Sequence, residues 1–282
     1  MHSTLQSLRS FFLWLAGQPG FRSKISYSDA DYFNLTDKEV RIAAVEREQL
    51  VPTIEQINHV LATMPAGTDI ERRNRALIAF ALMTGARDGA IASLRLKHVN
   101  LERGLLIQDP REVRTKASKS MTTFFFPVGG EALAIVTEWI GHLRATLLRG
   151  DDDPLFPATE VGIGPDRRFG PVGLSRKGWS NATPIRKIFA AAFSGAQLPY
   201  FNPHSFRKTL AQLGEAMCKS PEEFKAWSQN LGHEQVLTTL TSYGSLSQAK
   251  QGEVMKRLEI ASGNDDDPRA LAARLASLLS SA

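Results

Sequence analysis

Apolar residues recur at the spacing of an α-helix along most of this 282-residue chain, which predicts a mainly helical protein. The first apolar stripe runs from Leu5 to Leu15 and marks a helix over residues 4–16. Residues 69–83 are basic at their start and apolar afterwards, which is typical of a helix buried in a core. Apolar spacing or start signals predict the remaining helices, over residues 54–64, 88–95, 131–148, 183–193, 221–229 and 269–280, and a polar helix over 246–260.

Helix starts are marked by residues that accept hydrogen bonds from the free backbone N–H groups of a first turn. Thr53 stands directly before one apolar stripe and caps it. Asn202 is followed by Pro203, which suits the first helical position because no N–H is needed there. Ser220 and Glu223 form a capping box at the start of another helix.

Three short runs of strand-like composition lie between the helices, at Leu105–Ile107, Glu112–Lys116 and Thr122–Val128. They predict a small three-stranded antiparallel sheet, so the fold class is mainly α with α+β character. Residues 149–174 are rich in Gly, Pro and Asp and are predicted to form a long loop.

The pattern divides the chain into three segments. Residues 1–50 hold two or three short helices, which are too few to close a hydrophobic core alone. Residues 51–262 are enough for a domain with a sizeable core. An acidic hinge at 263–268 begins the segment 263–282, whose apolar helix we expect to dock onto its own domain or onto a neighbouring subunit.

The composition favours a soluble protein with a polyanionic partner, since the net charge is +5 and the sequence pI is about 9.4. Cys218 is the only cysteine, which excludes an intramolecular disulfide and a cysteine-based zinc site. The sequence contains no membrane-length apolar run and no signal-peptide pattern. We therefore expect a cytoplasmic protein without a membrane partner.

The residues with the clearest chemistry lie between positions 202 and 244. His204 and Arg207 share one face of a first helical turn, where free N–H groups and the helix dipole favour an anion. Leu231-Gly232-His233 and Tyr243 follow. Because the stretch has no carboxylate pair and no Gly-rich phosphate loop, it suits phosphoryl transfer to a tyrosine hydroxyl, with charge neutralised by side chains and no metal or cofactor.

These motifs, together with Thr-Gly-Ala-Arg at residues 84–87, resemble the signature of the tyrosine recombinase (phage integrase) family over roughly residues 52–250. The resemblance implies a helical catalytic domain that cleaves and rejoins DNA strands through a 3′-phosphotyrosyl intermediate, without ATP or metal. Tyr243 would be the nucleophile, with Tyr200 a much weaker rival. Arg87 and Arg207 would clamp the phosphate, beside His204 and His233.

The family holds its catalytic lysine on a β-hairpin, and two lysines of this chain fit that description. Lys116 matches by its place eleven residues before Pro127, and Lys119 is the alternative. The resemblance also implies that residues 1–50 are the end of a helical DNA-binding domain, and that the protein is a monomer in solution and a tetramer on double-stranded DNA.

Basic residues outside the signature are candidates for contacts with DNA phosphates: Lys119, Arg167, Arg168, Arg176 and Lys177. The histidines at 2, 59, 98 and 142 form no metal-ligand pair at helical spacing.

Two features depart from the family pattern and leave other functions open. The family usually has an acidic residue three positions after the first arginine, whereas this chain has Ala90, and its nearest acid is Asp88. The spacing from His233 to Tyr243 is ten residues, where about nine are expected. A DNA-binding protein with weak or lost catalysis is therefore one alternative, and a type IB topoisomerase-like enzyme is another.

Overall fold

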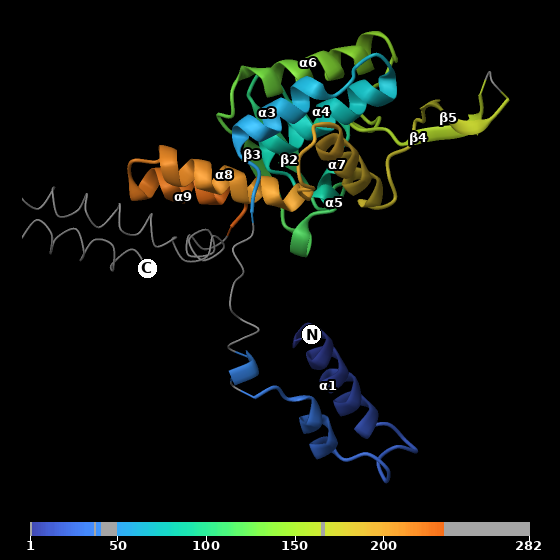
Figure 1. Ribbon diagram of the computed structural model, residues 1–282, viewed down its shortest axis with the longest axis vertical. Helices are drawn as coiled ribbons and strands as arrows, with labels where there is room; N and C mark the ends of the chain where they lie inside the picture. The colour runs from blue at the N-terminus through green and yellow to red at the C-terminus, as the bar shows by residue number, and fades with distance from the viewer. Residues whose placement is uncertain (1, 37, 41–49, 165–166, 234–282) are drawn as a thin grey trace, which may run out of the picture. The chain divides into compact units, whose positions relative to one another are not determined.

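The computed structural model describes residues 2–36, 38–40, 50–164 and 167–233. Within these residues the chain forms two compact units, Met1–Leu50 and Val51–Ala282 (Figure 1). No helix among them is long and apolar enough to cross a membrane. Tyr243, the predicted helices at 246–260 and 269–280, and the hinge at 263–268 lie outside the described residues.

The first unit contains α1 (His2–Ala16), as predicted, and a short 3₁₀ helix, η1 (Tyr27–Phe33). Ser26 precedes η1, and its backbone N–H donates to Asp29 Oδ2 at 2.8 Å. The ring of Phe12 packs against Phe33, with centroids 5.0 Å apart. Among the described residues of this unit only Ala16 and Ala30 are buried, which agrees with the expectation that it does not close a core.

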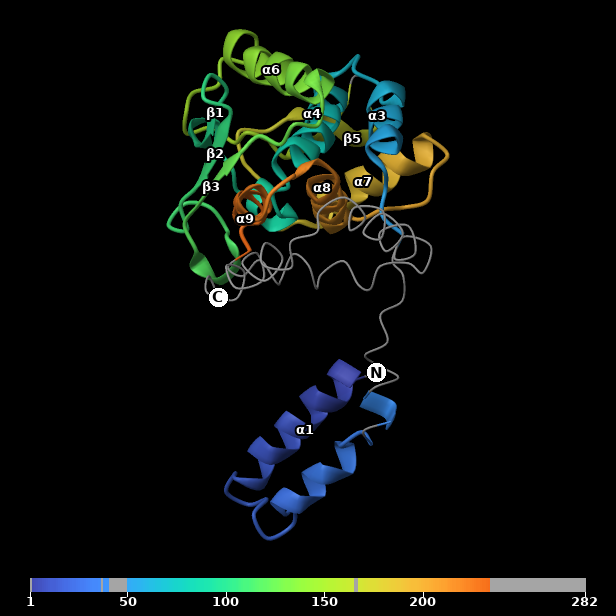
Figure 2. The ribbon, with the colours of Figure 1, turned by 90° about the vertical axis from the view of Figure 1, so that its left-hand side faces the viewer.

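The second unit is organised around α4 (Asp69–Thr84), whose residues 76–84 are all buried. In both views α4 lies among α3 (Ile54–Thr63), α6 (Gly130–Ala145) and α8 (Pro203–Met217) (Figures 1 and 2). Caps set the helix starts as predicted: Thr53 accepts from Gln56 N at 3.2 Å. The apolar run of the sequence thus becomes the centre of the core.

The other helices surround this centre. They are α5 (Asp88–Ile91), η2 (Leu96–His98), α7 (Thr183–Gly195) and α9 (Pro221–Asn230). The caps of α8 and α9 are confirmed, because Asn202 Oδ1 accepts from Ser205 N and Ser220 Oγ from Glu223 N, both at 3.1 Å. The return bond of the predicted capping box differs, because Glu223 Oε2 accepts from Lys219 N. The predicted helix over 88–95 is wrong in length: it ends after one turn, where the Ser93 hydroxyl bonds back to Ala90 O at 2.9 Å.

The predicted three-stranded antiparallel sheet is present, but one of its strands differs. Its order is β1 (Val99–Asn100), β2 (Leu105–Gln108) and β3 (Met121–Phe124), with Leu106 opposite both Val99 and Thr123. The predicted strand at Glu112–Lys116 is wrong. Val113 N bonds to Asp109 O at 2.8 Å, which turns the chain, and residues 116–118 form the 3₁₀ helix η3 (Lys116–Ser118).

The prediction of a long loop over 149–174 is also wrong. β4 (Thr159–Ile163) and β5 (Phe169–Leu174) pair antiparallel as a hairpin that projects from the helices of its unit (Figure 1). The stretch was predicted as a loop because glycine and proline, which it contains at several positions including Pro171, are depleted in strands. The fold class stands as mainly helical with small antiparallel sheets.

Two contacts of α8 fix its place in the core. The Thr209 hydroxyl donates to Pro52 O at 2.6 Å, and Trp227 Nε1 on α9 donates to Leu210 O at 2.9 Å. A Cβ at Gly214 would lie 2.5 Å from Trp227 Nε1. The indole therefore reaches the α8 backbone only because residue 214 has no side chain.

Candidate active site

The end of α4 carries the first predicted site motif. Gly85 has φ +58°, and a Cβ there would lie 2.9 Å from Leu210 Cδ1 and 3.3 Å from Leu231 Cδ2. Both the left-handed backbone and the close packing require glycine. The tight turn delivers Arg87, half-buried, to the N-cap position of α5.

A single buried guanidinium joins the three described motifs. Arg207 Nη1 donates to Gly85 O at 2.6 Å, and Nη2 donates to Leu231 O. Nη2 also lies 3.3 Å from His233 Nε2. Arg207 itself is only 3% exposed. Segments near residues 85, 207 and 231 thus meet at one side chain, although they are far apart in the sequence.

His233 lies just beyond α9, where its backbone N–H donates to Ser228 O at 3.2 Å. Burial first, and then the charges of Arg207, Arg87, His204 and Lys116, together lower the pKa of His233 to about 4. The imidazole is therefore neutral near pH 7. A neutral ring keeps one nitrogen able to accept a hydrogen bond or a proton.

His204 stands one turn before Arg207 at the start of α8 and is exposed. Its pKa is lowered from the ordinary value by partial loss of solvent, then by Arg207, Arg87 and Lys208, while Asp88 raises it. Loss of solvent also lowers the pKa of Arg87. The site therefore gathers positive charge around two histidines that remain neutral, an arrangement suited to a phosphodiester.

Asp88, the acid nearest to Arg87 in the sequence, is engaged elsewhere. Its Oδ2 accepts from Arg186 Nε on α7 at 2.8 Å, and its Oδ1 accepts from Gly89 N at 2.9 Å. Sequence reasoning did not single out Arg186, because no local pattern pairs it with a residue about a hundred positions away.

Lys116 is exposed on the loop between β2 and β3, in η3. The two residues after it, Ala117 and Ser118, have φ of 56° and 53°, an uncommon conformation for residues other than glycine. Lys116 is among the charges that lower the pKa of His233, so the loop brings it toward the site. Lys119 lies three residues further along and is also exposed. The choice between the two lysines stays a prediction.

The four predicted DNA contacts of residues 167–177 lie around the projecting hairpin. Arg167 and Arg168 precede β5 at the turn, and both are exposed. Arg176 follows β5, with Nη1 3.8 Å from Asp153 Oδ2 and Nη2 donating to Leu148 O at 3.3 Å. Lys177 beside it is exposed. The structure separates these residues into a pair at the turn and a pair at the base.

The predicted nucleophile, Tyr243, lies outside the described residues, and its rival Tyr200 is 52% exposed before α8. Within the described ranges no group of His, Cys, Asp and Glu side chains is arranged to hold a metal ion. Among the described site residues, Arg207 thus lies beside His233, and Arg87, His204 and Lys116 are close enough for their charges to lower the pKa of His233.

Comparisons with known proteins show the family and the fold. The family model described as "Phage integrase family" matches residues 51–250. The chain is 26% identical over 187 residues to tyrosine recombinase XerC of Lactobacillus leichmannii, covering 66% of this chain and 55% of that protein. It is also 26% identical over 202 residues to tyrosine recombinase XerC of Pseudomonas entomophila (strain L48), covering 70% and 58%. The chain thus spans a little over half the length of these curated relatives.

Solved structures show the same fold. XerH site-specific recombinase, in a post-cleavage complex with a palindromic difH substrate, superposes with a TM-score of 0.53 at 16% identity, covering 90% of this chain and 72% of that one. XerA recombinase superposes with a TM-score of 0.52 at 13% identity, covering 90% and 83%.

Proposed function

The chain belongs to the phage integrase family, and from that premise we propose that it is a site-specific DNA recombinase. It would cleave and rejoin DNA strands through a 3′-phosphotyrosyl intermediate. The observation that carries the proposal is the Arg207 guanidinium, which holds the Gly85 turn and the Leu231–His233 turn at one place. Arg87 emerges from the first of these turns.

The proposed cleavage reaction combines attack of a tyrosine oxygen on phosphorus with two proton transfers. The Tyr243 oxygen attacks the scissile phosphorus, a P–O bond to tyrosine forms, and the bond to the 5′ oxygen breaks. Lys116 gives a proton to the departing 5′ oxygen, and a neutral histidine, His204 or His233, accepts the tyrosine proton. The 5′ hydroxyl of another strand then reverses these steps, so the phosphodiester energy is kept.

Arg87 and Arg207 act on the non-bridging oxygens. The transition state spreads negative charge over those oxygens, and fixed donors aimed at developing charge usually supply the largest catalytic term. A guanidinium matches the geometry of two oxygens and stays charged near neutral pH. Arg207 is held in place before DNA binds by Gly85 O and Leu231 O.

The partner would be double-stranded DNA, bound by monomers that assemble into a tetramer on two duplexes. Residues 1–50 would be the end of a helical DNA-binding domain, and residues 263–282 a docking tail. Lys119 and the basic residues around the β4–β5 hairpin would contact phosphates. The protein would act in the cytoplasm, without a cofactor.

The test uses a duplex selected from randomised DNA by binding to this protein, then nicked beside the cleavage position so that the short 5′-OH fragment diffuses away. The unmutated protein and Tyr243→Phe are incubated with it in EDTA and resolved on a denaturing gel. We expect a covalent protein–DNA adduct only with the unmutated protein. An adduct that survives Tyr243→Phe would show that another residue is the nucleophile.

Two other functions give different outcomes. The engagement of Asp88 by Arg186, with Ala90 at the place of the family's acid, favours a DNA-binding protein without catalysis. That protein would select a duplex and form no adduct. A type IB topoisomerase-like enzyme would form the adduct and relax a supercoiled plasmid that lacks the selected site, whereas a recombinase requires the site.

A further inference from the structure

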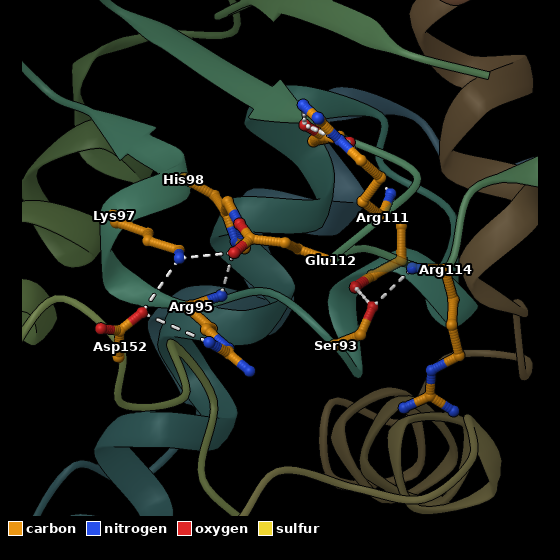
Figure 3. Close-up of polar contacts among 10 residues, drawn as sticks. Ser93, Arg95, Lys97, His98, Arg111, Glu112, Arg114 and Asp152 are labelled. Atoms are coloured by element: carbon orange, nitrogen blue, oxygen red, sulfur yellow. Dashed lines mark hydrogen bonds and ion pairs between the residues drawn. The ribbon is translucent and has the colours of Figure 1, made fainter. Parts of the chain in front are cut away.

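The loop between β2 and β3, which carries Lys116, is attached to the rest of its unit at two points just before that lysine. Glu112 lies in one set of ion pairs and Arg114 in a separate set of hydrogen bonds (Figure 3). Figure 3 shows the Arg114 guanidinium pointing away from the cluster formed by Lys97, Glu112 and Asp152. Val113, between the two attachments, is 2% exposed.

Arg114 binds backbone groups of two other segments. Its Nη1 donates to Ser180 O, and its Nη2 donates to Trp179 O at 2.5 Å and to Ala92 O at 3.5 Å. Its own N–H donates to Ser93 Oγ at 2.9 Å. A planar guanidinium can serve several acceptors at fixed angles, which an ammonium on a flexible stem cannot reproduce.

The contact with Ser93 leads back to the phosphate clamp. The Ser93 hydroxyl donates to Ala90 O at 2.9 Å, and Ala90 lies in α5, the one-turn helix that begins after Arg87. Trp179, whose carbonyl Arg114 binds, is itself 8% exposed, with Arg73 stacked 5.0 Å from its ring. Arg114 thus ties the loop to α5 and to a buried part of the fold.

The attachment at Glu112 joins partly exposed side chains to the buried ring of His98. Glu112 lies 2.6 Å from Lys97 Nζ and 3.0 Å from His98 Nε2, and Lys97 continues to Asp152 at 2.9 Å. Hydrogen bonds from Lys97 and His98 lower the pKa of Glu112. Exposed ion pairs contribute little individually. Arg114 is exposed too, but it hydrogen-bonds to Ala92 O, Ser93 Oγ, Trp179 O and Ser180 O on two other segments, so it is the stronger constraint on the loop.

Beyond Lys116 the chain returns to the site. Met121 begins β3, and its sulfur would lie 2.3 Å from a Cβ at Gly232, the residue before His233. The stretch from Lys116 to Ser120 is exposed. It is therefore fixed at one end by Arg114 and at the other by the contact of Met121 with Gly232.

We propose that Arg114 is a positioning residue for the proton donor, and that its hydrogen bonds to Ala92, Trp179 and Ser180 set where Lys116 stands relative to Arg87 and His233. This inference rests on the proposed function. Arg114 touches neither DNA nor the reacting atoms in this role. Without it the loop keeps Val113 and Glu112 in place, but the segment that bears Lys116 is free to shift.

The test separates proton donation from the other steps. A nicked duplex is prepared with sulfur in place of the bridging 5′ oxygen at the cleaved phosphate. A thiolate leaves without a proton because a thiol has a pKa of about 8.5, far below that of an alcohol. We expect Arg114→Ala to slow adduct formation on ordinary DNA by about 10- to 100-fold, since a misplacement of about 1 Å can cost about 100-fold. On the sulfur-containing DNA it should match the unmutated protein within about threefold.

Three variants make the result specific. Arg111→Ala is the matched control, because Arg111 is on the same loop, is 86% exposed and pairs with Asp109 only two residues away. It removes the same charge without detaching the loop, and should leave both rates within about twofold, as expected for loss of an exposed pair. Lys116→Ala should show the same rescue by sulfur as Arg114→Ala. Arg114→Lys should still form the adduct slowly on ordinary DNA, since it keeps the positive charge but loses the planar guanidinium that binds several acceptors.

Each other outcome overturns the inference in a recognisable way. Equal slowing on both DNAs, with weaker DNA binding and a shallower salt dependence, would make Arg114 a phosphate contact. Unchanged rates on both DNAs would show that the loop does not need Arg114. No rescue of Lys116→Ala would remove Lys116 as the proton donor. If the unmutated protein forms no adduct on either DNA, it is the proposed function that fails.

Discussion

The Arg207 guanidinium lies in the interior, where carbonyls on two segments accept its hydrogen bonds, whereas the Lys116 ammonium stands on an exposed loop. Arg207 is fixed by the same contacts that hold the Gly85 and Leu231 turns together. Lys116 depends on attachments made by its neighbours in the sequence. The two regions therefore place their cations in opposite ways.

This difference matches the two tasks that we assign to them. A group that stabilises charge in a transition state works best when it is already oriented, because no reorganisation is then needed. A proton donor must instead meet an oxygen that moves away from phosphorus. We infer that variants in the clamp should change folding and catalysis together, whereas variants in the loop should change catalysis alone.

The largest effect is expected from Arg207→Ala. It removes one clamp donor, which should slow adduct formation by about 100- to 1,000-fold. It also leaves the buried carbonyls of Gly85 and Leu231 without this donor, which should lower the free energy of unfolding by about 1–3 kcal/mol. Adduct kinetics and urea unfolding would measure both changes. A loss of activity at unchanged stability would contradict the claim that the contacts of Arg207 hold the two turns together.

Lys116→Ala comes next. General acid catalysis commonly contributes about 100- to 10,000-fold, but water can supply the proton in place of the lysine, so the loss should lie at the low end of that range, about 100-fold. Its stability should equal that of the unmutated protein, since the side chain is exposed. Lys119→Ala is the control, and the same nicked-duplex kinetics decide between the two lysines. A larger loss with Lys119→Ala would move the proton donor by three residues.

Gly85→Ala should affect the clamp without removing any of its functional groups. The φ of +58° and the 2.9 Å approach to Leu210 Cδ1 both penalise a Cβ, and together they should cost about 1–3 kcal/mol of unfolding free energy. Gly89→Ala is the matched control, because no atom lies within 4 Å of its Cβ position and its φ is ordinary. Thermal and urea midpoints that fall equally for both would show that the turn tolerates a side chain.

The smallest expected effect is a dependence of stability on pH that comes from His233, because its ring is only partly buried and solvent screens much of the interaction. Its pKa in the folded protein is about 4, below the ordinary 6.5. Between these values the unfolded chain binds more protons, so the free energy of unfolding should fall as the pH drops from about 6.5 toward 4. Urea midpoints at several pH values would follow this loss. His233→Gln should give a flatter curve, and an identical curve would mean that other groups cause it.

Helix starts and the core were predictable from the sequence because their causes are local. Thr53, Asn202 and Ser220 each accept a hydrogen bond from a residue three positions later. The apolar run of α4 needs no distant partner to be recognised. Three of the signature motifs are also local patterns, and in the described residues Arg207 bonds to Gly85 O and Leu231 O and lies 3.3 Å from His233 Nε2.

The elements that the sequence did not reveal have either hydrogen-bond partners far away in the sequence or a residue composition that is unusual for their secondary structure. The β4–β5 hairpin forms from a stretch rich in glycine, proline and aspartate, and the run at Glu112–Lys116 has strand-like residues that are turned by the bond from Val113 to Asp109. Arg114 binds carbonyls more than sixty residues away, and no spacing rule marks such a contact.

The buried hydrogen bond from Thr209 to Pro52 has a mechanical consequence. Thr209 stands two residues after Arg207 on α8, and Pro52 precedes the first helix of its unit. The hydrogen bond therefore links the backbone at Pro52 to α8 about half a helical turn from Arg207. A displacement of Pro52 should therefore reach α8 close to Arg207, and Thr209→Val would remove this hydrogen bond while keeping a side chain of similar shape.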